Sequence, residues 1–369
     1  MSFIATNPSA NPARITNIQS GRLISINIRP QPRESIMSLC SRLAAELRER
    51  AATPLHLLIF GNCRSQTPVM DAFRRSFNNV ECPVTWAEGT ACDGHFIAGI
   101  QAHAFTGEVE RLTFDGRISA SIFTDGGARQ CFIGGIGPAD GLASQSWQTL
   151  QALENLQMVL ADAGFELRDV VRTWFFLDDI LSWYDDFNRA RTSIYSGLKF
   201  RTGSLPASTG VGAANPSGTA LTLAAWAFKP VDMNAYAEEV ASPLQCPAPA
   251  YGSSFSRAME TSTSVGRRLV ISGTASIAPG GKTLWDGDVR KQIETTMEVV
   301  EAILRSRSFA LTDLTRATAY FRRVADAPVF AEWLAERRLF KLPVVSAQCD
   351  VCRDDLLFEL EADAETQKS

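Results

Sequence analysis

A pattern that occurs twice constrains the fold of this chain more than any other feature of its sequence. Each copy has a strand that ends in glycine, an amphipathic helix opened by glutamine, and the sequence L-x-D-[VL]-x-R leading into a second strand. The copies occupy 132–176 and 270–321. The repeat predicts two structurally equivalent units within one chain.

The spacing of apolar residues predicts the helices of both copies. Apolar side chains recur at three- and four-residue steps over 150–160 and 293–304. Second helices are expected at 183–195 and 328–338, and each copy then closes with Leu-Pro and a strand. The order strand-strand-helix-strand-helix-strand predicts an α+β unit whose helices pack on one face of a sheet.

The repeat divides the chain into four parts. We expect an N-terminal α/β region over 1–126, repeated units over 127–230 and 256–369, and a linker over 231–255, where Pro, Gly and Ser cluster. The second repeated unit is expected to carry the active site. The N-terminal region has strand and helix signals of its own, and the sequence leaves open whether it is a diverged third copy.

Composition and charge exclude several classes of function. The net charge of −4 gives no reason to expect a nucleic-acid partner. Runs of roughly 18 apolar residues are absent, so no membrane-spanning helix is expected. The beginning of the chain has no secretory signal pattern, and eight cysteines in 369 residues do not make a disulfide framework. These features favour a cytoplasmic protein.

The sequence contains no recognisable cofactor motif. Cys349 and Cys352 form a C-x-x-C pair, but there is no second pair, and the histidines His56, His95 and His103 lie far away in sequence. We therefore expect no metal site. Because no phosphate-binding glycine loop precedes a helix, catalysis without a cofactor is predicted.

The last predicted strand carries the most unusual residue. Glu359 lies within 352–361 at a position where an apolar side chain is expected, and Cys352 opens the segment. If Glu359 points inward, burial would raise its pKa and make it a proton donor near neutral pH. If it faces solvent, it is an ordinary surface carboxylate, and Cys352 is equally compatible with inert packing.

Both copies resemble the Rid/YjgF family, small α+β enzymes that assemble as trimers with active sites between subunits. The resemblance lies in the strand-glycine pair, the helix at 148–155 and the Leu-Pro turns at 205–206 and 342–343. It implies either a monomer that is an internal pseudo-trimer or a homotrimer. The functional Glu on the last strand of that family matches Glu359, and the first copy is apolar at the corresponding place, around 223–225.

A narrower resemblance is to the chorismatases, which split chorismate into pyruvate and a cyclic carboxylic acid. It lies in short segments over most of the chain, and the set of segments is more specific than any one of them. The segments are 83–89, 172–174, 206–212, 255–258, 272–276 and 352–359. A departure is Pro249, two residues before Tyr251, where this family leads us to expect a further tyrosine.

The chorismatase resemblance implies a role for each candidate residue. Glu359 would protonate the terminal methylene carbon of chorismate and then stabilise the oxocarbenium ion as a carboxylate. Arg172 and Arg316, at equivalent positions of the two copies, would hold the two substrate carboxylates, with Arg353 as a third candidate. Tyr251 would hydrogen-bond a ring hydroxyl. Either of the two equivalent arginines could instead pair with a neighbouring aspartate.

Cys352 and Ala275 are the candidates that select the ring product. A cysteine near this place accompanies the hydroxybenzoate-forming type of the family, whereas Ala275 is the bulkier alternative to glycine on the facing strand. We expect 3-hydroxybenzoate, with 4-hydroxybenzoate as a second product. Attack by water would give a dihydroxy-diene acid instead.

Two other functions stay open at this point. A Rid-type deaminase of enamines or imines needs a carboxylate-binding arginine near the closing turn, where this chain has Ser208 and Ser346. A non-catalytic protein that binds a small metabolite would keep the cleft without turnover. Replacing Glu359 with Gln separates an enzyme from a pure binder, because only the enzyme needs the proton.

Overall fold

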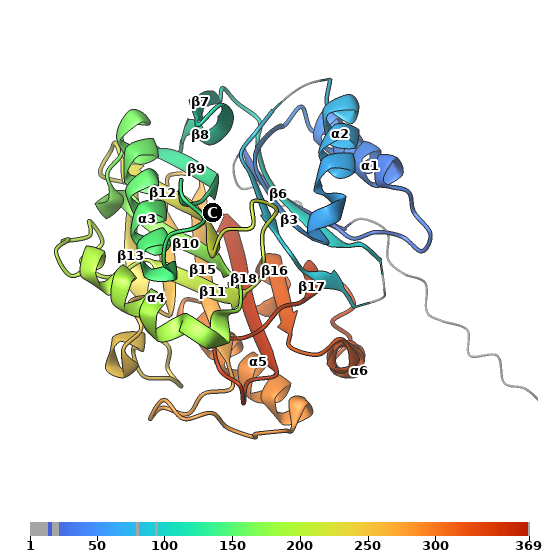
Figure 1. Cartoon of the computed structure of the whole chain (residues 1–369), viewed down its shortest axis with the longest axis vertical. Helices are drawn as coiled ribbons and strands as arrows, with labels where there is room; N and C mark the ends of the chain where they lie inside the picture. Colours follow the sequence, from blue (N-terminus) through green and yellow to red (C-terminus); the bar gives the residue numbers. More distant parts are fainter. Residues whose placement is uncertain (1–13, 17–21, 79–80, 93–94, 368–369) are drawn as a thin grey trace, which may run out of the picture.

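Three β-sheets with helices on their outer faces pack around a shared core (Figure 1). The computed structural model describes residues 14–16, 22–78, 81–92 and 95–367. The mixture of sheets and helices confirms the predicted α+β class. Both predicted second helices are present, with bounds within a few residues of those expected.

The elements fall into three units along the chain. The first unit contains β1 (Arg14–Thr16), β2 (Leu23–Ile28), α1 (Ile36–Glu49), β3 (Thr53–Gly61), α2 (Gln66–Ser76), β4 (Val84–Ala87), β5 (Thr90–Ala91) and β6 (Ile97–Phe105). The second contains β7 (Glu110–Phe114), β8 (Arg117–Asp125), β9 (Ala128–Ile136), α3 (Gln145–Asp162), β10 (Val170–Leu177), α4 (Ile180–Tyr195), β11 (Ala207–Gly212) and β12 (Leu221–Pro230). The third contains β13 (Tyr236–Val240), β14 (Ala258–Ser262), β15 (Gly266–Ala275), α5 (Val289–Ser306), β16 (Leu314–Phe321), α6 (Ala327–Glu336), β17 (Val344–Gln348) and β18 (Phe358–Gln367). Short 3-10 turns are η1 (Cys63–Ser65), η2 (Leu167–Asp169), η3 (Ala248–Tyr251), η4 (Leu311–Asp313) and η5 (Val324–Asp326).

The three sheets share one plan. Their strand orders are β1-β2-β6-β3-β4, β7-β8-β9-β12-β10-β11 and β13-β14-β15-β18-β16-β17-β5. In each sheet the parallel pair is the same, namely β3 with β4, β10 with β11 and β16 with β17. The N-terminal unit therefore follows the order of the two units that the sequence repeat marks, except that it has one strand fewer before its first helix and the additional strand β5.

The pairing registers identify equivalent positions in the three units. A register shift, or β-bulge, interrupts the equivalent strand pairs at the same place. Beyond it, the first equivalent pairs are His56 with His103, Arg172 with Trp226 and Arg316 with Asp363. Four residues further along the strands, the equivalent pairs are Phe60 with Gly99, Phe176 with Thr222 and Tyr320 with Glu359.

The first long helix of each unit begins at a side chain that caps its N-terminus. Ser35 accepts a hydrogen bond from the backbone N–H of Ser38, and Ser144 accepts one from that of Trp147. Asp288 accepts one from the backbone N–H of Lys291. Because the first N–H groups of a helix have no partner within it, these caps fix where each helix starts.

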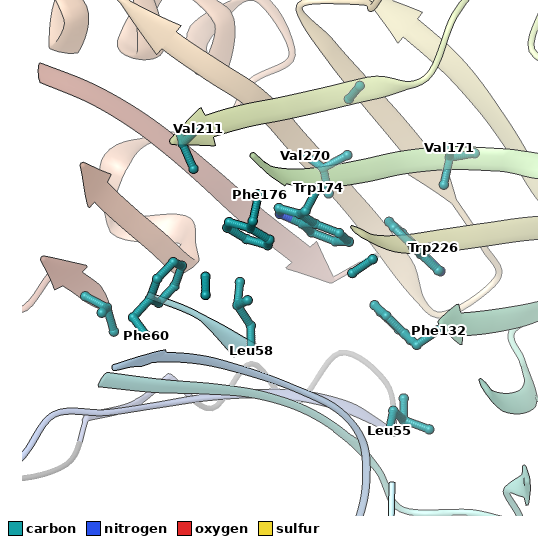
Figure 2. Packing of buried hydrophobic residues seen from close by; sticks show 14 of the residues in the cluster. Leu55, Leu58, Phe60, Phe132, Val171, Trp174, Phe176, Val211, Trp226 and Val270 are labelled. Atoms are coloured by element: carbon teal, nitrogen blue, oxygen red, sulfur yellow. The ribbon is translucent and has the colours of Figure 1, made fainter. Parts of the chain in front are cut away.

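Each sheet is buried on both faces. The outer faces pack against the helices of their own unit, in three separate apolar clusters. The inner faces meet in a fourth cluster, the central core, which takes side chains from all three units (Figure 2). Phe60 of the first unit contacts Phe176 of the second and Tyr320 of the third edge-to-face, each with ring centroids 5.9 Å apart. This double burial explains the nearly continuous apolar strands.

Two boundaries predicted from the sequence are wrong. The boundary at residue 126 assigned β7 and β8 to the N-terminal region, but both belong to the second sheet, where β8 pairs with β9. The linker over 231–255 includes β13, which pairs with β14 as the edge strand of the third sheet. Pro and Gly clusters mark turns but do not show that a short edge strand lies between them.

Replacing Phe60 with Ala should destabilise all three units together. The ring fills the point where the inner faces meet, and deleting a buried aromatic side chain costs about 3–5 kcal/mol. We expect a single unfolding transition, followed by circular dichroism, at a lower denaturant concentration than in the unchanged protein. Phe340→Ala, at an exposed position, should leave the midpoint unchanged. Separate transitions for separate units would contradict a shared core.

Candidate functional site

A cavity lies between the second and third units, beside the N-terminal end of β18, where Glu359 is placed. Its empty volume is about 520 Å³. A wider depression adjoins it and shares Tyr184, Tyr251, Ser253, Cys352 and Arg353, so these residues form its mouth. The cavity is lined by Tyr184, Arg191, Ser208, Gly210, Tyr251, Ser253, Phe255, Arg257, Gly273, Ala275, Ile277, Cys352, Arg353 and Glu359.

Glu359 is a buried carboxyl group whose pKa is strongly raised. Its exposed fraction is 4%. Burial raises the pKa to about 8, and the charge of Glu361 adds to this effect, while Arg172 and Arg257 oppose it. The group therefore carries its proton over much of the range around neutral pH, unlike an ordinary carboxylate.

Gly273 leaves the space that the Glu359 carboxyl group occupies. The two residues lie on neighbouring strands, since β15 pairs with β18. A Cβ atom at position 273 would come within 2.0 Å of Glu359 Oε1. A side chain at this position would therefore force the carboxyl group to move.

Two buried arginines bring positive charge to the cavity without a partner carboxylate. Arg191 of α4 is 2% exposed, and Arg257, just before β14, is 3% exposed. Arg191 hydrogen-bonds Asn188 at 2.7 Å and Arg257 donates to the carbonyl of Cys246 at 3.0 Å. Neither forms an ion pair within the part of the chain that the structure describes, and Arg257 Nη2 has no hydrogen-bond partner there. Buried guanidinium groups in this condition favour an anionic ligand.

Arg353 and Tyr251 form part of the cavity mouth. Arg353 donates a hydrogen bond to the carbonyl of Gly281 at 2.6 Å. The guanidinium groups of Arg353 and Arg257 lie 5.6 Å and 5.3 Å from the centroid of the Tyr251 ring. Burial raises the pKa of Tyr251 to about 12, so its hydroxyl group stays neutral and can donate a hydrogen bond.

Cys352 and Ala275 lie on the cavity wall beside Glu359. Burial raises the pKa of the Cys352 thiol to about 12, and Glu359 adds to the increase while Arg353 opposes it. The thiol is therefore neutral, which argues against a nucleophilic role. Ala275 faces Glu359 directly across the β15–β18 pairing.

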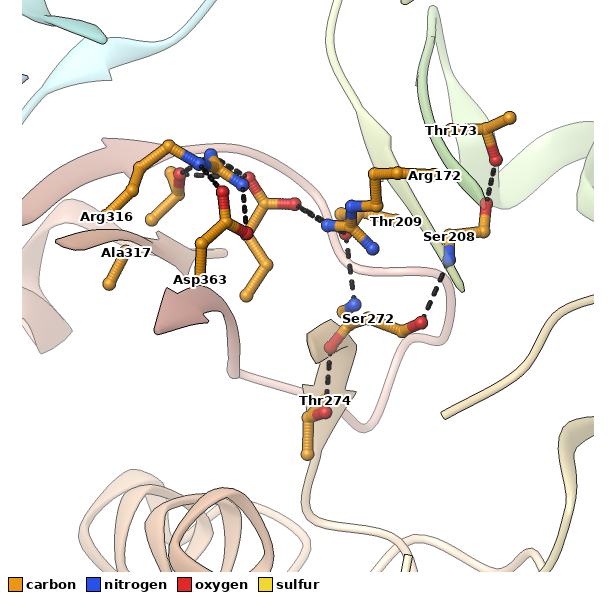
Figure 3. Close-up of polar contacts among 12 residues, drawn as sticks. Arg172, Thr173, Ser208, Thr209, Ser272, Thr274, Arg316, Ala317 and Asp363 are labelled. Atoms are coloured by element: carbon orange, nitrogen blue, oxygen red, sulfur yellow. Dashed lines mark hydrogen bonds and ion pairs between the residues drawn. The ribbon is translucent and has the colours of Figure 1, made fainter. Parts of the chain in front are cut away.

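Arg172 lies behind the cavity wall instead of in its lining. It contacts Glu361 at 2.5 Å and Thr209 at 2.7 Å. The Thr209 hydroxyl oxygen also accepts a hydrogen bond from the backbone N–H of Gly273 at 3.0 Å. Figure 3 shows this link between Arg172 and the strand that carries Gly273. Arg172 therefore acts on Glu359 through its charge and does not reach the cavity.

Arg316 is not brought to the cavity, which corrects its predicted role as a substrate anchor. It lies in the centre of the molecule, paired with Glu361 at 2.7 Å and Asp363 at 2.9 Å (Figure 3). It also donates to Gln101 of the first unit at 2.8 Å. Two carboxylates already satisfy its charge, so it has no free face for a ligand.

The structure therefore brings five of the seven predicted residues to one cavity. They are Glu359, Cys352, Arg353, Tyr251 and Ala275. No sequence pattern points to Arg191, because the apolar spacing of its helix gives no sign of a polar inner face. Arg257 was not among the predicted site residues, although it lies in one of the segments behind the chorismatase resemblance.

The described residues contain no group of three or more His, Cys, Asp or Glu side chains that could hold a metal ion. Within the same residues, no helix is both long and apolar enough to cross a membrane.

Stability should depend on pH through Glu359. In the folded protein the pKa of Glu359 is about 8, above the ordinary value of 4.5. Between about pH 4.5 and pH 8, therefore, the folded protein keeps a proton on Glu359 that the unfolded chain has released. The free energy of unfolding should therefore fall as pH rises through this window, relative to Glu359→Gln, which cannot titrate. Urea denaturation of both proteins at about pH 5 and about pH 9 measures this difference. If the free energy of unfolding changed equally in both proteins between the two pH values, the carboxyl group would not be buried in protonated form.

Several known proteins match part of this chain in sequence, and a solved structure matches nearly all of it in fold. Residues 129–221 match the model of the family described as Endoribonuclease L-PSP. A 3-hydroxybenzoate synthase of Streptomyces hygroscopicus is 29% identical over 224 residues, which cover 53% of this chain and 64% of that protein. A chorismatase of Streptomyces rapamycinicus is 30% identical over 213 residues, which cover 52% of this chain and 63% of that protein. The matched regions thus span less than two thirds of either relative.

A crystal structure of a chorismatase matches almost the whole molecule. The match has a TM-score of 0.65 and 18% identity, and covers 95% of this chain and 99% of the other. At this identity the likeness shows a common fold. The chain therefore has the chorismatase fold and is a relative of proteins named chorismatase and 3-hydroxybenzoate synthase, as its sequence motifs predicted.

Proposed function

We propose that this protein is a chorismatase, which cleaves the enol ether of chorismate to pyruvate and a cyclic carboxylic acid. The observation that carries the proposal is a buried carboxyl group, Glu359, with a pKa of about 8 in a cavity lined by three arginines. This combination suits a dianionic substrate that must be protonated on carbon. The names of the relatives support the same chemistry.

Glu359 supplies the proton in this proposal. Transfer to the terminal methylene carbon of the enolpyruvyl group converts the enol ether into an oxocarbenium ion. The carboxylate that remains lies next to this cation and stabilises it. A carboxyl group with an ordinary pKa would be ionised at neutral pH and could not begin the reaction.

Arg191, Arg257 and Arg353 replace the pair of arginines expected from the sequence as substrate anchors. Arg191 and Arg257 are buried and have no carboxylate partner in the described chain, so a substrate carboxylate would supply the missing charge. Arg353 lies at the mouth, beside Tyr251. Tyr251 keeps its expected role as a hydrogen-bond donor to a ring hydroxyl.

The proposed ring product is 3-hydroxybenzoate, with 4-hydroxybenzoate as a second product. In this route the ring hydroxyl oxygen bonds to the neighbouring carbon that carries the enolpyruvyl oxygen, which leaves with pyruvate, and the hydroxyl proton is lost to give an epoxide. Cleavage of one epoxide C–O bond and loss of a ring proton then complete the aromatic system, and the bond that breaks decides between 3- and 4-hydroxybenzoate. Chorismate alone supplies the atoms of both products. The neutral Cys352 thiol and Ala275 narrow the space beside Glu359, which disfavours a water molecule there.

Incubation of the pure protein with chorismate should release pyruvate together with a hydroxybenzoate. Glu359→Gln should lower kcat by roughly 10²–10⁴-fold, because it removes the proton donor. Pyruvate is followed with lactate dehydrogenase and the ring product by chromatography. The matched control is Glu332→Gln, at an exposed glutamate on α6.

Other outcomes of this assay separate the alternatives. Pyruvate with a dihydroxy-diene acid would keep the enzyme and overturn the intramolecular route. Pyruvate release no faster than the spontaneous decay of chorismate would exclude the proposal. Full activity in Glu359→Gln would remove Glu359 from the mechanism.

Gly273→Ala should inactivate the enzyme while leaving its fold intact. The added Cβ would meet Glu359 Oε1 at 2.0 Å, and the flexible end of that side chain can move away. A displacement of about 1 Å at a reacting group costs on the order of 100-fold in rate. Gly280→Ala is the control, because no atom lies within 4 Å of a Cβ at that position. Steady-state kinetics and thermal melts of both variants test the expectation, and an active Gly273→Ala protein would contradict it.

A further inference from the structure

A second and larger cavity lies between the first and second units. Its empty volume is about 1220 Å³, compared with about 520 Å³ for the cavity at Glu359. Its walls come from α2, the segment leading into β4, the start of β8, the end of β9 and the loop between β11 and β12. The lining includes Phe73, Arg74, Trp86, Arg117 and Thr222.

The strand registers show that this cavity is the structural equivalent of the one at Glu359. Both lie between the parallel edge of one unit and the matching central strands of the next. Phe176 and Tyr320 are equivalent positions of the second and third units. Since Phe176 pairs with Thr222 and Tyr320 pairs with Glu359, Thr222 is the counterpart of Glu359. The β9–β12 and β15–β18 pairings give further counterparts. These are Gly135 for Gly273 and Gly137 for Ala275.

This register also corrects the sequence comparison of the two copies. The alignment of motifs matched Glu359 with the apolar segment around 223–225. In β10 the β-bulge comes before Phe176, between Val170 and Arg172. Beyond it, the residue that pairs with Phe176 is Thr222, whose hydroxyl donates to the carbonyl of Ile136 at 3.3 Å. The equivalent cavity therefore has a hydroxyl where the other has an acid.

The third equivalent interface, between the third and first units, is closed by side chains. Gly99 stands in the place of Glu359, and a Cβ atom there would meet both methyl groups of Val345 at 2.7 Å. At all three interfaces the end of the parallel edge strand bonds to the next unit, as between β17 and β5 and between Gly212 and Asp350, so the Val345 side chain packed against Gly99 is what closes this one. The two cavities described here thus lie at the other two interfaces.

The second cavity combines buried aromatic side chains with arginine side chains that are partly exposed to solvent. Phe73 and Trp86 are buried aromatic side chains, and the indole N–H of Trp86 donates to the carbonyl of Gly61 at 2.9 Å. Arg74 and Arg117 are half exposed, and their nearest carboxylates, 2.8 Å and 3.9 Å away, are exposed as well. Glu81 also lines the cavity, so the lining residues together carry one net positive charge, and the two aspartates beside the arginines lie outside the lining.

We propose that this cavity binds small carboxylic acids with a flat cyclic body and does not transform them. The ring of the ligand packs against Phe73 and Trp86, and its carboxylate lies between Arg74 and Arg117. Chemistry stops at binding because Thr222 has no acidic proton to transfer at neutral pH. The inference does not depend on what reaction Glu359 carries out.

Isothermal titration with benzoate tests this site, using Arg191→Gln/Arg257→Gln protein so that the first cavity loses its anchors. We expect one benzoate site to remain in this background. Adding Arg74→Gln and Arg117→Gln should weaken that site roughly tenfold or more, because charge-assisted hydrogen bonds are lost. Adding Arg75→Gln instead should have no effect, since Arg75 lies on α2 beside Arg74 but outside the cavity lining.

Two further measurements keep the proposal open to refutation. Benzyl alcohol, a neutral molecule of the same shape, should bind at least tenfold more weakly than benzoate. Gly137→Leu should block binding by occupying the cavity, because a Cβ there meets only ordinary contacts at 3.4 Å and 3.7 Å. Equal binding of the alcohol, equal weakening by Arg75→Gln, or full binding in Gly137→Leu would each overturn the proposal.

Discussion

A buried set of charges at the meeting point of the three sheets supports the rest of this structure. Arg172 of the second unit and Arg316 of the third both contact Glu361, and Arg316 also contacts Asp363. Two positive and two negative groups balance one another. Burial alone would raise the pKa of both carboxyls, but the neighbouring arginines outweigh it and lower the pKa of Glu361 and Asp363. Removing one partner would leave a buried charge uncompensated, at a cost of about 3–5 kcal/mol.

The same network explains why one carboxyl group on β18 differs from its neighbours. Glu359, Glu361 and Asp363 alternate along the strand and share its inner face. Glu361 and Asp363 lie against the arginines and stay ionised. Glu359 lies at the end of the face, buried but without an ion pair within the described residues, and the ionised Glu361 raises its pKa further. A structural ion pair and a proton donor thus come from three acidic residues on one strand.

The three equivalent interfaces have diverged through a few side chains. One holds an acid and buried arginines, one has Thr222 and a larger cavity, and one is filled by Val345 beside Gly99. In a trimer of identical chains the three interfaces would have to change together. Fusion of the units into one chain lets each interface carry a different side chain at the same position of the same fold.

The sequence by itself determined the repeat, the α+β class and most of the candidate site. Glu359 could be found because an acid in an apolar strand is costly unless it has a function, and the segments around Cys352 and Tyr251 carried a family resemblance. The sequence left open whether the N-terminal region is a third copy, because its equivalent positions hold different residues, such as His56 in place of Arg172 and Arg316.

Only the tertiary structure decided which arginines face the cavity. Arg172 and Arg316 lie four residues before Phe176 and Tyr320 on their strands, which places them about 13 Å further into the molecule. There they meet acidic residues of β18 that are distant in sequence. Arg191 and Arg257 come from a helix and a loop of different units, and their approach to Glu359 depends on how those units pack. Sequence spacing records neighbours along one element, whereas a site between units is set by the packing of elements that no local pattern connects.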